Sequence, residues 1–312
     1  MKKFIRFLNK KLFWFIYRFK PLYMFPFPNF VCIEASTYCN LKCVCCPTGQ
    51  GKKGMSKGFL KFKDFKKFVD KYNHFIERIQ LSNYGEPFLN TKIFKIIKYA
   101  ENKGIKTSAD TNLNYFNESM AEKLIKSGMS ELTISIDGVT NESYSKYRVN
   151  GDLNKVISNI KRINKFKRKY NSDKPKLNWQ FIVFSHNEHE INRAKGMAEK
   201  LNMHFYIKRG LNFGQNFSLP SQKYRINTSY ILEKYCYQLW HLPTINYNGN
   251  LLGCCILFDE KYHFGNIFKE GFFYVYNNKK MRAARRIILK KLKKANISSI
   301  YCSKCWVSKK FL

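Results

Sequence analysis

Acidic side chains are scarce in this chain of 312 residues, in which 57 Lys and Arg stand against 21 Asp and Glu for a formal net charge of +36. The first 28 residues contain no acid at all. Such a surplus favours anionic partners, among them lipid head groups, nucleic acid, phosphorylated substrates and an acidic electron donor. An A/T-rich coding sequence would also enrich Lys, Asn, Ile, Phe and Tyr, but drift alone does not explain the missing acids of residues 1–28.

The chain also lacks an uncharged run of about 18 or more apolar residues, which excludes a membrane-spanning helix. Residues 1–28 have no small-residue cleavage site after their apolar stretch, so we expect no cleavable signal peptide. Ten cysteines are present, but four of them crowd into residues 39–46, too closely for separate disulfide bridges. Because free thiols persist in reducing compartments, these features predict a cytoplasmic protein.

Three of the crowded cysteines are regularly spaced: Cys39, Cys43 and Cys46 form a C-x3-C-x2-C pattern that leads into Pro47. Iron-sulfur clusters in proteins are normally held by four Cys, so three well-spaced thiolates would leave one iron for another molecule. The alternative interpretations are a structural zinc knuckle and a group of buried thiols. Cys45 either packs as a small apolar residue or offers an alternative thiolate.

From Phe30 onward, strand-like apolar runs alternate with amphipathic helical patterns, which predicts parallel strands joined by right-handed crossovers. About six such units suit an α/β fold of the partial (β/α)6 TIM-like barrel type, whose chemistry lies at the carboxyl ends of the strands. The predicted strands are 31–35, 78–82, 105–110, 131–136, 177–184 and 204–208, and the predicted helices lie near 59–72, 91–103, 117–127, 152–170 and 188–201.

The cysteine triplet and its setting, residues 34–41 with the sequence Glu-Ala-Ser-Thr-Tyr-Cys-Asn-Leu, resemble the radical S-adenosylmethionine (radical SAM) enzymes. In that family SAM binds the open iron through its amino and carboxylate groups, and reductive cleavage produces a 5′-deoxyadenosyl radical that abstracts a hydrogen atom from the substrate. The resemblance implies a [4Fe-4S] cluster on Cys39, Cys43 and Cys46 with SAM as its partner, and the same barrel fold.

Residues 82–87, after the second predicted strand, look like the Gly-Gly-Glu-Pro motif with which this family holds the SAM amino group. Tyr84 replaces the first Gly of that motif, whereas Gly85, Glu86 and Pro87 are retained. A turn at the end of a strand supplies the acceptors that such a group needs.

Three further positions correspond to recurrent family sequences at strand ends. Thr111 and Asn112 stand where the family has Thr-Asn-Gly, without the Gly, and imply a SAM-ribose contact or an active-site wall. Ser135 and Asp137 close the fourth predicted strand, and one of them is expected to face SAM. Arg148 is a candidate partner for the SAM carboxylate, with a solvated cation as the alternative.

Beyond the barrel, residues 209–228 have the composition of a linker. The part after it resembles the SPASM and twitch extensions of radical SAM enzymes, which bind auxiliary four-iron clusters, and the cysteine count favours the twitch form with one auxiliary [4Fe-4S] cluster. Two of its cysteines flank a predicted hairpin with a turn at Asn248-Gly249. A zinc site is the alternative, and Cys255 could replace one ligand. The implied ligands are Cys236, Cys254, Cys302 and Cys305.

The resemblance implies an enzyme that oxidises or modifies its substrate through hydrogen abstraction, served by an acidic electron donor of flavodoxin or ferredoxin type. Too few residues precede the barrel for the leader-binding domain that peptide-modifying members often carry, so a small molecule or carbohydrate is favoured as substrate. Peptide or protein modification, including sulfatase maturation, is the alternative. A zinc-containing nucleic-acid-binding protein is an alternative of another class, but no RNA-binding module is recognisable.

The first 20 residues place Phe4, Leu8, Leu12, Phe15 and Phe19, among other apolar residues, at helical spacing between cations. Such a segment can lie in the interface of an anionic membrane, or it can cap the open bottom of the barrel. We therefore expect a basic amphipathic segment over 1–28, the barrel over 29–208, the linker over 209–228 and the auxiliary-cluster domain over 229–312.

Overall fold

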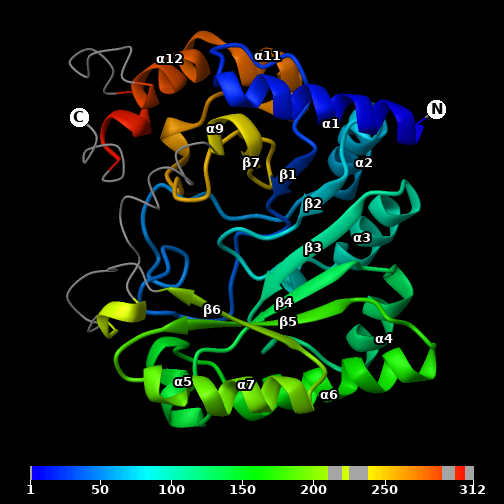
Figure 1. The fold of residues 1–312 in the computed structure, drawn as a ribbon, viewed down its shortest axis with the longest axis vertical. Coiled ribbons are helices and arrows are strands. Elements are labelled where there is room, and N and C mark those ends of the chain that lie inside the picture. Colours follow the sequence, from blue (N-terminus) through cyan, green and yellow to red (C-terminus); the bar gives the residue numbers. More distant parts are fainter. Residues whose placement is uncertain (1, 210–219, 225–237, 290–298, 306–312) are drawn as a thin grey trace.

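The computed structural model describes residues 2–209, 220–224, 238–289 and 299–305. A seven-stranded sheet forms its centre, in the order β6-β5-β4-β3-β2-β1-β7 with all neighbours parallel (Figure 1). The partial barrel predicted from the sequence is confirmed, and the carboxy-terminal region adds a seventh strand to it. The strands are β1 (Phe30–Ile33), β2 (Arg78–Gln80), β3 (Lys106–Thr111), β4 (Glu131–Ser135), β5 (Lys176–Val183), β6 (His204–Arg209) and β7 (Thr244–Ile245).

The crossover helices begin and end at the signals that the sequence carries. Asn117 caps α4 by accepting the Met120 amide, and Asp152 caps α6 by accepting the amides of its first turn. Gly128, with a φ of +76°, ends α4 in the left-handed conformation that Gly adopts readily. The helices around the barrel are α2 (Phe62–Tyr72), α3 (Ile93–Asn102), α4 (Glu118–Ser127), α5 (Asn141–Tyr147), α6 (Leu153–Lys169) and α7 (Ile191–Lys200).

The two faces of the sheet differ in polarity. Side chains such as Ile79, Leu132, Ile134, Trp179 and Phe181 point to the helices and are fully buried in the main hydrophobic core. Alternate residues of the same strands point to the opposite, inner face because side chains alternate along a strand. This outer layer therefore fixes the register of the strands, and with it the position of every loop at their carboxyl ends.

The carboxy-terminal region joins the sheet through β7, whose Thr244 and Ile245 pair with Cys32 and Ile33 of β1. A tight turn follows, in which the Asn246 amide donates to the carbonyl of Asn250, as the predicted hairpin requires. The remaining described helices are α9 (Gln238–His241), α10 (Ile267–Glu270), α11 (Phe272–Asn277) and α12 (Lys279–Ile288). Most of the predicted linker, 210–219 and 225–228, and the predicted ligand Cys236 lie outside the described residues.

Helix α1 (Lys2–Phe19) lies at the amino-terminal ends of the strands, beside α11 and α12 (Figure 1). Arg6 donates to the carbonyls of Asn73, at the end of α2, and of Lys103 and Gly104, at the end of α3. The described helices include none that is long and apolar enough to cross a membrane.

Candidate functional site

The cysteine triplet lies in the loop after β1, at the carboxyl end of the sheet. The loop is bent back on itself, because the Cys46 amide donates to the carbonyl of Cys43 at 3.2 Å and the Gln50 amide donates to that of Cys46 at 2.9 Å. Gly49 is required for this packing, since a Cβ there would lie 2.6 Å from the Cys43 amide nitrogen. The sequence thus brings the thiols of Cys39, Cys43 and Cys46 to one place.

Burial, together with the nearby charges of Glu86, Cys43 and Cys46, raises the pKa of the Cys39 thiol to about 12. Burial likewise raises the pKa of Cys43, against the opposing charge of Arg148. Thiols in such surroundings are neutral unless a cation compensates their charge, and iron does so when it binds the thiolate. The donor chemistry therefore fits a cluster.

The three thiols do not converge on a single ion: within the described ranges no three His, Cys, Asp or Glu side chains are arranged to hold one metal ion. Four thiolates around one zinc would lie about 4 Å from each other, given Zn–S bonds of about 2.3 Å. A four-iron cluster binds each thiolate through a different iron, so its ligands lie farther apart. A four-iron cluster therefore does not need its thiolates to converge on one ion, as a zinc knuckle does.

A buried glutamate shapes the loop that follows β2. Glu34, only 2% exposed, accepts the backbone amides of Asn83 at 3.1 Å, Tyr84 at 2.9 Å and Gly85 at 3.0 Å. Gly85 presses so closely on the first loop that a Cβ would lie 1.9 Å from the carbonyl oxygen of Ser36. Glu34 was not among the site residues predicted from the sequence, because its partners are backbone amides that no motif specifies.

Glu86, from the same loop, links the loop after β2 to the end of β3 through hydrogen bonds. Its carboxylate accepts the Thr111 hydroxyl at 2.7 Å and the amides of Asn112 at 2.8 Å and Phe88 at 3.2 Å. Burial raises the pKa of Glu86 to about 7, although these donors oppose the rise. Pro87 starts the short helical turn that follows. The structure thus brings the predicted residues Gly85, Glu86, Pro87, Thr111 and Asn112 together.

Asn112 connects this group to the cysteines, because its side-chain amide donates to Asn40 at 3.0 Å and to the Cys39 sulfur at 3.6 Å. The next residue, Leu113, has a φ of +53° and is fully buried. Positive φ is uncommon outside Gly, so the backbone keeps the left-handed conformation that the expected Gly would adopt freely. The departure from the motif therefore leaves the shape of the turn intact.

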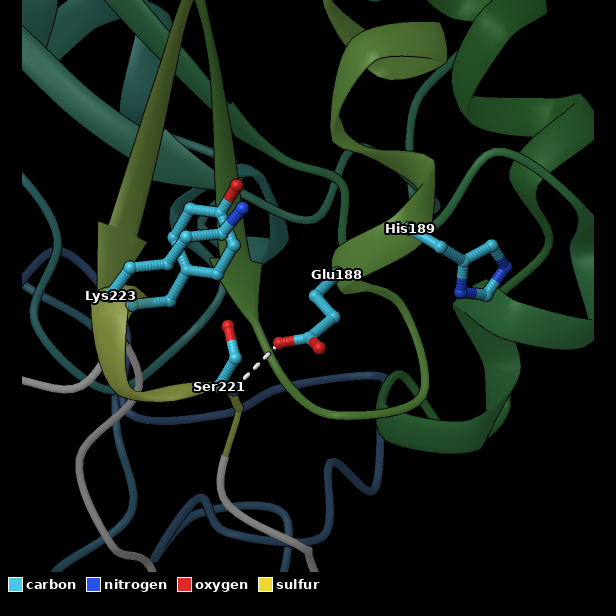
Figure 2. Close-up of a pocket in the computed structure, with 5 residues that line it drawn as sticks. Glu188, His189, Ser221 and Lys223 are labelled. Atoms are coloured by element: carbon cyan, nitrogen blue, oxygen red, sulfur yellow. Dashed lines mark hydrogen bonds between the residues drawn. The ribbon is translucent and has the colours of Figure 1, made fainter.

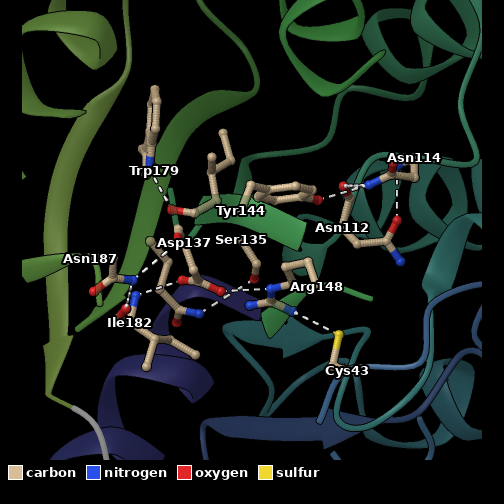
Figure 3. A network of polar contacts seen from close by, with 12 residues as sticks. Cys43, Asn112, Asn114, Ser135, Asp137, Tyr144, Arg148, Trp179, Ile182 and Asn187 are labelled. Atoms are coloured by element: carbon tan, nitrogen blue, oxygen red, sulfur yellow. Dashed lines mark hydrogen bonds and ion pairs between the residues drawn. The ribbon is translucent and has the colours of Figure 1, made fainter. Parts of the chain in front are cut away.

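Arg148 lies between Asp137 and the cysteine loop (Figure 3). Its Nε donates to Asp137 Oδ2 at 2.6 Å, and its Nη1 lies 3.8 Å from the Cys43 sulfur. Asp137 is fully buried and also accepts the Ile182 amide at 2.6 Å, which fixes the carboxylate and through it the guanidinium. Ser135, on the same strand, instead accepts the side chain of Gln180 at 3.4 Å. Of the two, Asp137 is the one connected to the cysteines.

The inner face of the sheet carries a row of polar side chains that the sequence analysis did not identify. Asp110 pairs in register with Thr133, and Gln180 pairs with Tyr206, whose hydroxyl donates to the Gln180 side chain at 3.3 Å. Asp110 is exposed although it lies on a central strand, and Lys208 on β6 is exposed as well. Surrounding protein raises the pKa of Asp110, against the charge of Lys208. The inner face is therefore polar where TIM barrels are usually packed with apolar residues.

A second group of cysteines lies in the carboxy-terminal region. Burial, together with the charges of Cys255 and Cys305, raises the pKa of Cys254 to about 12. Besides burial, the charges of Cys305, Cys254 and Cys302 raise the pKa of the neighbouring Tyr301. The three predicted ligands that the structure describes therefore lie near this one residue. Cys255 has a different environment, because its amide and sulfur both contact the side chain of Gln238, at 2.9 Å and 3.3 Å.

Tyr84 lies between the two groups of cysteines. Its ring packs edge to face against the ring of Phe258, with 6.3 Å between the ring centres. Phe258 follows Cys254 by four residues. Burial raises the pKa of Tyr84 well above its usual value, and charge on Cys255, Cys254 and Cys46 adds to the rise. The residue that replaces Gly in the second motif thus fills space between the two sites.

A separate pocket of about 500 Å³ lies at the edge of the sheet (Figure 2). Its lining includes Glu188, which accepts the Ser221 amide at 2.7 Å, together with His189 and Lys223. None of the site residues predicted from the sequence lines it.

Two family models match the chain. The model of the Radical SAM superfamily matches residues 33–191, and the model of the SPASM iron-sulfur cluster-binding domain matches residues 236–306. Among curated proteins, the AdoMet-dependent heme synthase of Methanosarcina barkeri is 27% identical over 139 residues, which are 44% of this chain and 40% of that protein. The match therefore spans less than half of that relative.

Two solved structures have the same fold over nearly the whole chain. BtrN in complex with AdoMet and 2-DOIA superposes with a TM-score of 0.56 and 16% identity, covering 91% of this chain and 94% of that one. Streptococcus suis SuiB bound to the precursor peptide SuiA superposes with a TM-score of 0.65 and 16% identity, covering 92% of this chain and 73% of that one.

Proposed function

The chain belongs to the radical SAM superfamily, and we propose on this premise that it cleaves SAM reductively and removes a hydrogen atom from a small polar molecule. The two matched domains imply a SAM-binding [4Fe-4S] cluster and an auxiliary iron-sulfur cluster. When bound, the first cluster and SAM supply the hydrogen abstraction, and the protein supplies binding, orientation and exclusion of side reactions.

One observation carries the proposal: side chains positioned after two different strands, β3 and β4, point at the cysteine triplet, which itself follows β1. Asn112, after β3, reaches the Cys39 sulfur, and Arg148, held by Asp137 after β4, reaches the Cys43 sulfur. These residues were selected by separate motifs in the sequence. Their convergence is what a site for SAM beside a cluster requires.

The residues then have distinct roles. Cys39, Cys43 and Cys46 would hold the cluster, and SAM would complete it. The Gly85 region and the Glu86 carboxylate accept hydrogen bonds from the amino group of SAM. Arg148 binds its carboxylate through the donors that face the cysteines, because guanidinium and carboxylate are matched in charge and geometry. The segment at Thr111 and the strand end at Ser135 form walls of the site.

The auxiliary cluster is assigned to Cys254, Cys302 and Cys305, with Cys236 as the fourth ligand. Cys255 is the alternative to Cys254, and the Gln238 side-chain amide donates to its sulfur at 3.3 Å. An acidic flavodoxin or ferredoxin suits the positive charge of the chain as the electron donor.

The polar inner face supports a small substrate that carries hydroxyl or amino groups, such as a polyol or a carbohydrate. Asp110, Thr133, Gln180, Tyr206 and Lys208 offer both donors and acceptors on neighbouring strands. Tyr84 narrows the space toward the auxiliary cysteines, which favours a compact substrate. A peptide is the second candidate, because the fold is shared with SuiB, which was solved with a precursor peptide.

The test is formation of 5′-deoxyadenosine by the anaerobically reconstituted protein. Replacement of Cys39, Cys43 or Cys46 by Ala should abolish it, because each removes one ligand of the cluster that binds SAM. Cys45→Ala is the matched control, a neighbouring thiol outside the spaced triplet, and should retain it. Product formation by the Cys43→Ala protein would contradict the proposal.

The substrate class is tested with deuterated compounds, by following deuterium into 5′-deoxyadenosine. Deuterium is expected from a polyol, an amino sugar or another carbohydrate, and Asp110→Asn should lose this transfer while it still cleaves SAM without substrate. Transfer from peptides alone would favour the second candidate.

A further inference from the structure

Helix α1 is anchored to the barrel by one face only. Asn9 exchanges two hydrogen bonds with the backbone of Phe27, at 2.8 Å and 3.1 Å, and Phe13 is fully buried. Arg6 adds its contacts to the ends of α2 and α3. One face of the helix therefore caps the amino-terminal end of the barrel, which is one of the two roles that the sequence allowed.

A second face of α1 is apolar and open to solvent. Phe4, Leu8, Leu12, Phe15 and Phe19 lie on one side of the helix, because they are separated by three or four residues. Between 39% and 67% of each remains exposed. These five residues, which we call the apolar stripe, form a large continuous apolar surface, and soluble monomers rarely expose such a surface without a use for it.

The apolar stripe borders an apolar groove of about 890 Å³ between α1, residues 23–27 and α11. Leu8 and Leu12 line the groove from the helix, and Tyr23, Phe25 and Phe273 line it from the other side. Phe25 is 78% exposed and Tyr23 is 60% exposed. The groove thus extends the apolar stripe, and its lining is of the kind that packs against the hydrocarbon chains of lipids.

Cations surround the apolar surface. Lys11 and Arg18 are exposed on α1 at the edge of the apolar stripe. On α12, Arg282 lies 4.4 Å from the centre of the Tyr23 ring, and that helix has no acid and four Lys and Arg besides the buried Arg285. Apolar side chains next to cations match the two layers of an anionic membrane surface, the acyl chains and the head groups.

We propose that the apolar stripe, with Tyr23 and Phe25, docks on an anionic lipid bilayer. A second copy of the chain would bring two strongly cationic surfaces together, which repulsion opposes. The electron donor is also excluded as the partner of the apolar stripe. It must reach the cysteines, and these lie at the end of the barrel opposite to α1. Docking in this orientation keeps the cysteine site in water, open to donor and substrate.

Vesicle flotation of the full-length, reconstituted protein tests the proposal. The protein should float with vesicles that contain about one third phosphatidylglycerol and remain behind with pure phosphatidylcholine, because the cations need anionic head groups. Combined Phe15→Asp and Phe25→Asp substitutions should lower recovery about tenfold or more by placing charges among the acyl chains. Lys11→Glu with Arg18→Glu should lower it as well, and raised salt should weaken the binding of the parent protein.

Tyr170→Asp is the matched control, an exposed aromatic residue outside the apolar stripe, and should float like the parent. Iron content and 5′-deoxyadenosine formation show that each variant is folded. Equal flotation of the parent and the Phe15/Phe25 variant would overturn the proposal. It would also be overturned if the parent sediments as a dimer that these two substitutions dissociate, since the apolar stripe would then be a contact between copies.

Discussion

At the scale of single residues, the chain places its few acids where they organise the site. Glu34 binds three successive amides of the loop after β2, and Glu86 binds the segment after β3. Burying a carboxyl group is costly unless donors compensate it, so these contacts hold two loops in one arrangement. Glu34 is the residue whose role the sequence concealed, because its three partners are backbone amides and no motif specifies them.

Burial raises the pKa of Glu34 to about 7, above its ordinary value near 4.5. A carboxyl group whose pKa is raised by folding stabilises the folded state below its unfolded pKa, and this contribution is lost as pH rises through the folded pKa. Glu34→Gln, which mimics the neutral form, should therefore gain stability relative to the parent between pH 5 and pH 8, by on the order of 3 kcal/mol. Chemical unfolding of the metal-free, reduced chain at several pH values measures this difference.

Glu142→Gln is the control, because Glu142 is exposed on α5. Its stability difference from the parent should not change with pH. A pH-independent difference for Glu34→Gln would show that this carboxyl group does not titrate between pH 5 and 8.

At the scale of elements, six strands and five crossover helices could be predicted to within about three residues, because apolar periodicity and Gly or Asn ends specify them locally. Helix α5 was missed, since its seven residues are too short for a periodic pattern and its Thr140 and Ser143 cap is a local signal. For strand β7, the hairpin with its turn at Asn248-Gly249 was predicted, but the parallel pairing of Thr244 and Ile245 with β1 was not, because residues so far apart in the sequence meet only in the folded chain.

The same limit applies to the site. The motif residues could be named because each follows a predicted strand, whereas the polar inner face needs the register between strands. Asp110 and Thr133 are 23 positions apart and meet only when β3 and β4 align. The spacing of residues in the sequence does not specify how β3 and β4 align.

The auxiliary region makes a prediction about iron content. Reconstitution should give close to eight irons per chain, since two clusters hold four each, and the triple variant that replaces Cys39, Cys43 and Cys46 should retain about half. Adding Cys254→Ala to the triple variant should remove the remainder, whereas Cys255→Ala should not. Iron and zinc analysis decides between the alternatives, because zinc without iron in the triple variant would indicate a zinc module instead.

At the scale of the whole molecule, β7 makes the carboxy-terminal region part of the barrel sheet. Trp179 in the barrel and Trp240 in the carboxy-terminal region are both fully buried, so each reports on its own part. We expect urea unfolding, followed by the fluorescence of a variant with Trp179 as its one tryptophan and of another with Trp240, to give transitions at the same urea concentration. Ile245→Ala, in β7, should shift both equally, by about 2–5 kcal/mol for a large-to-small change in a core. An earlier transition at Trp240 would indicate two independently folding parts.

The pairing of β1 with β7 cannot form until most of the chain has been synthesised. Thr244, the pairing partner of Cys32, is synthesised roughly 200 residues after it. At ordinary rates of translation this delay is about 10 to 40 seconds. During that interval one side of β1 has no strand beside it, and open strand edges invite association with other chains. The loop with Cys39, Cys43 and Cys46 has already left the ribosome by then. Iron delivery to this loop during translation would therefore meet a barrel still open on its β1 side.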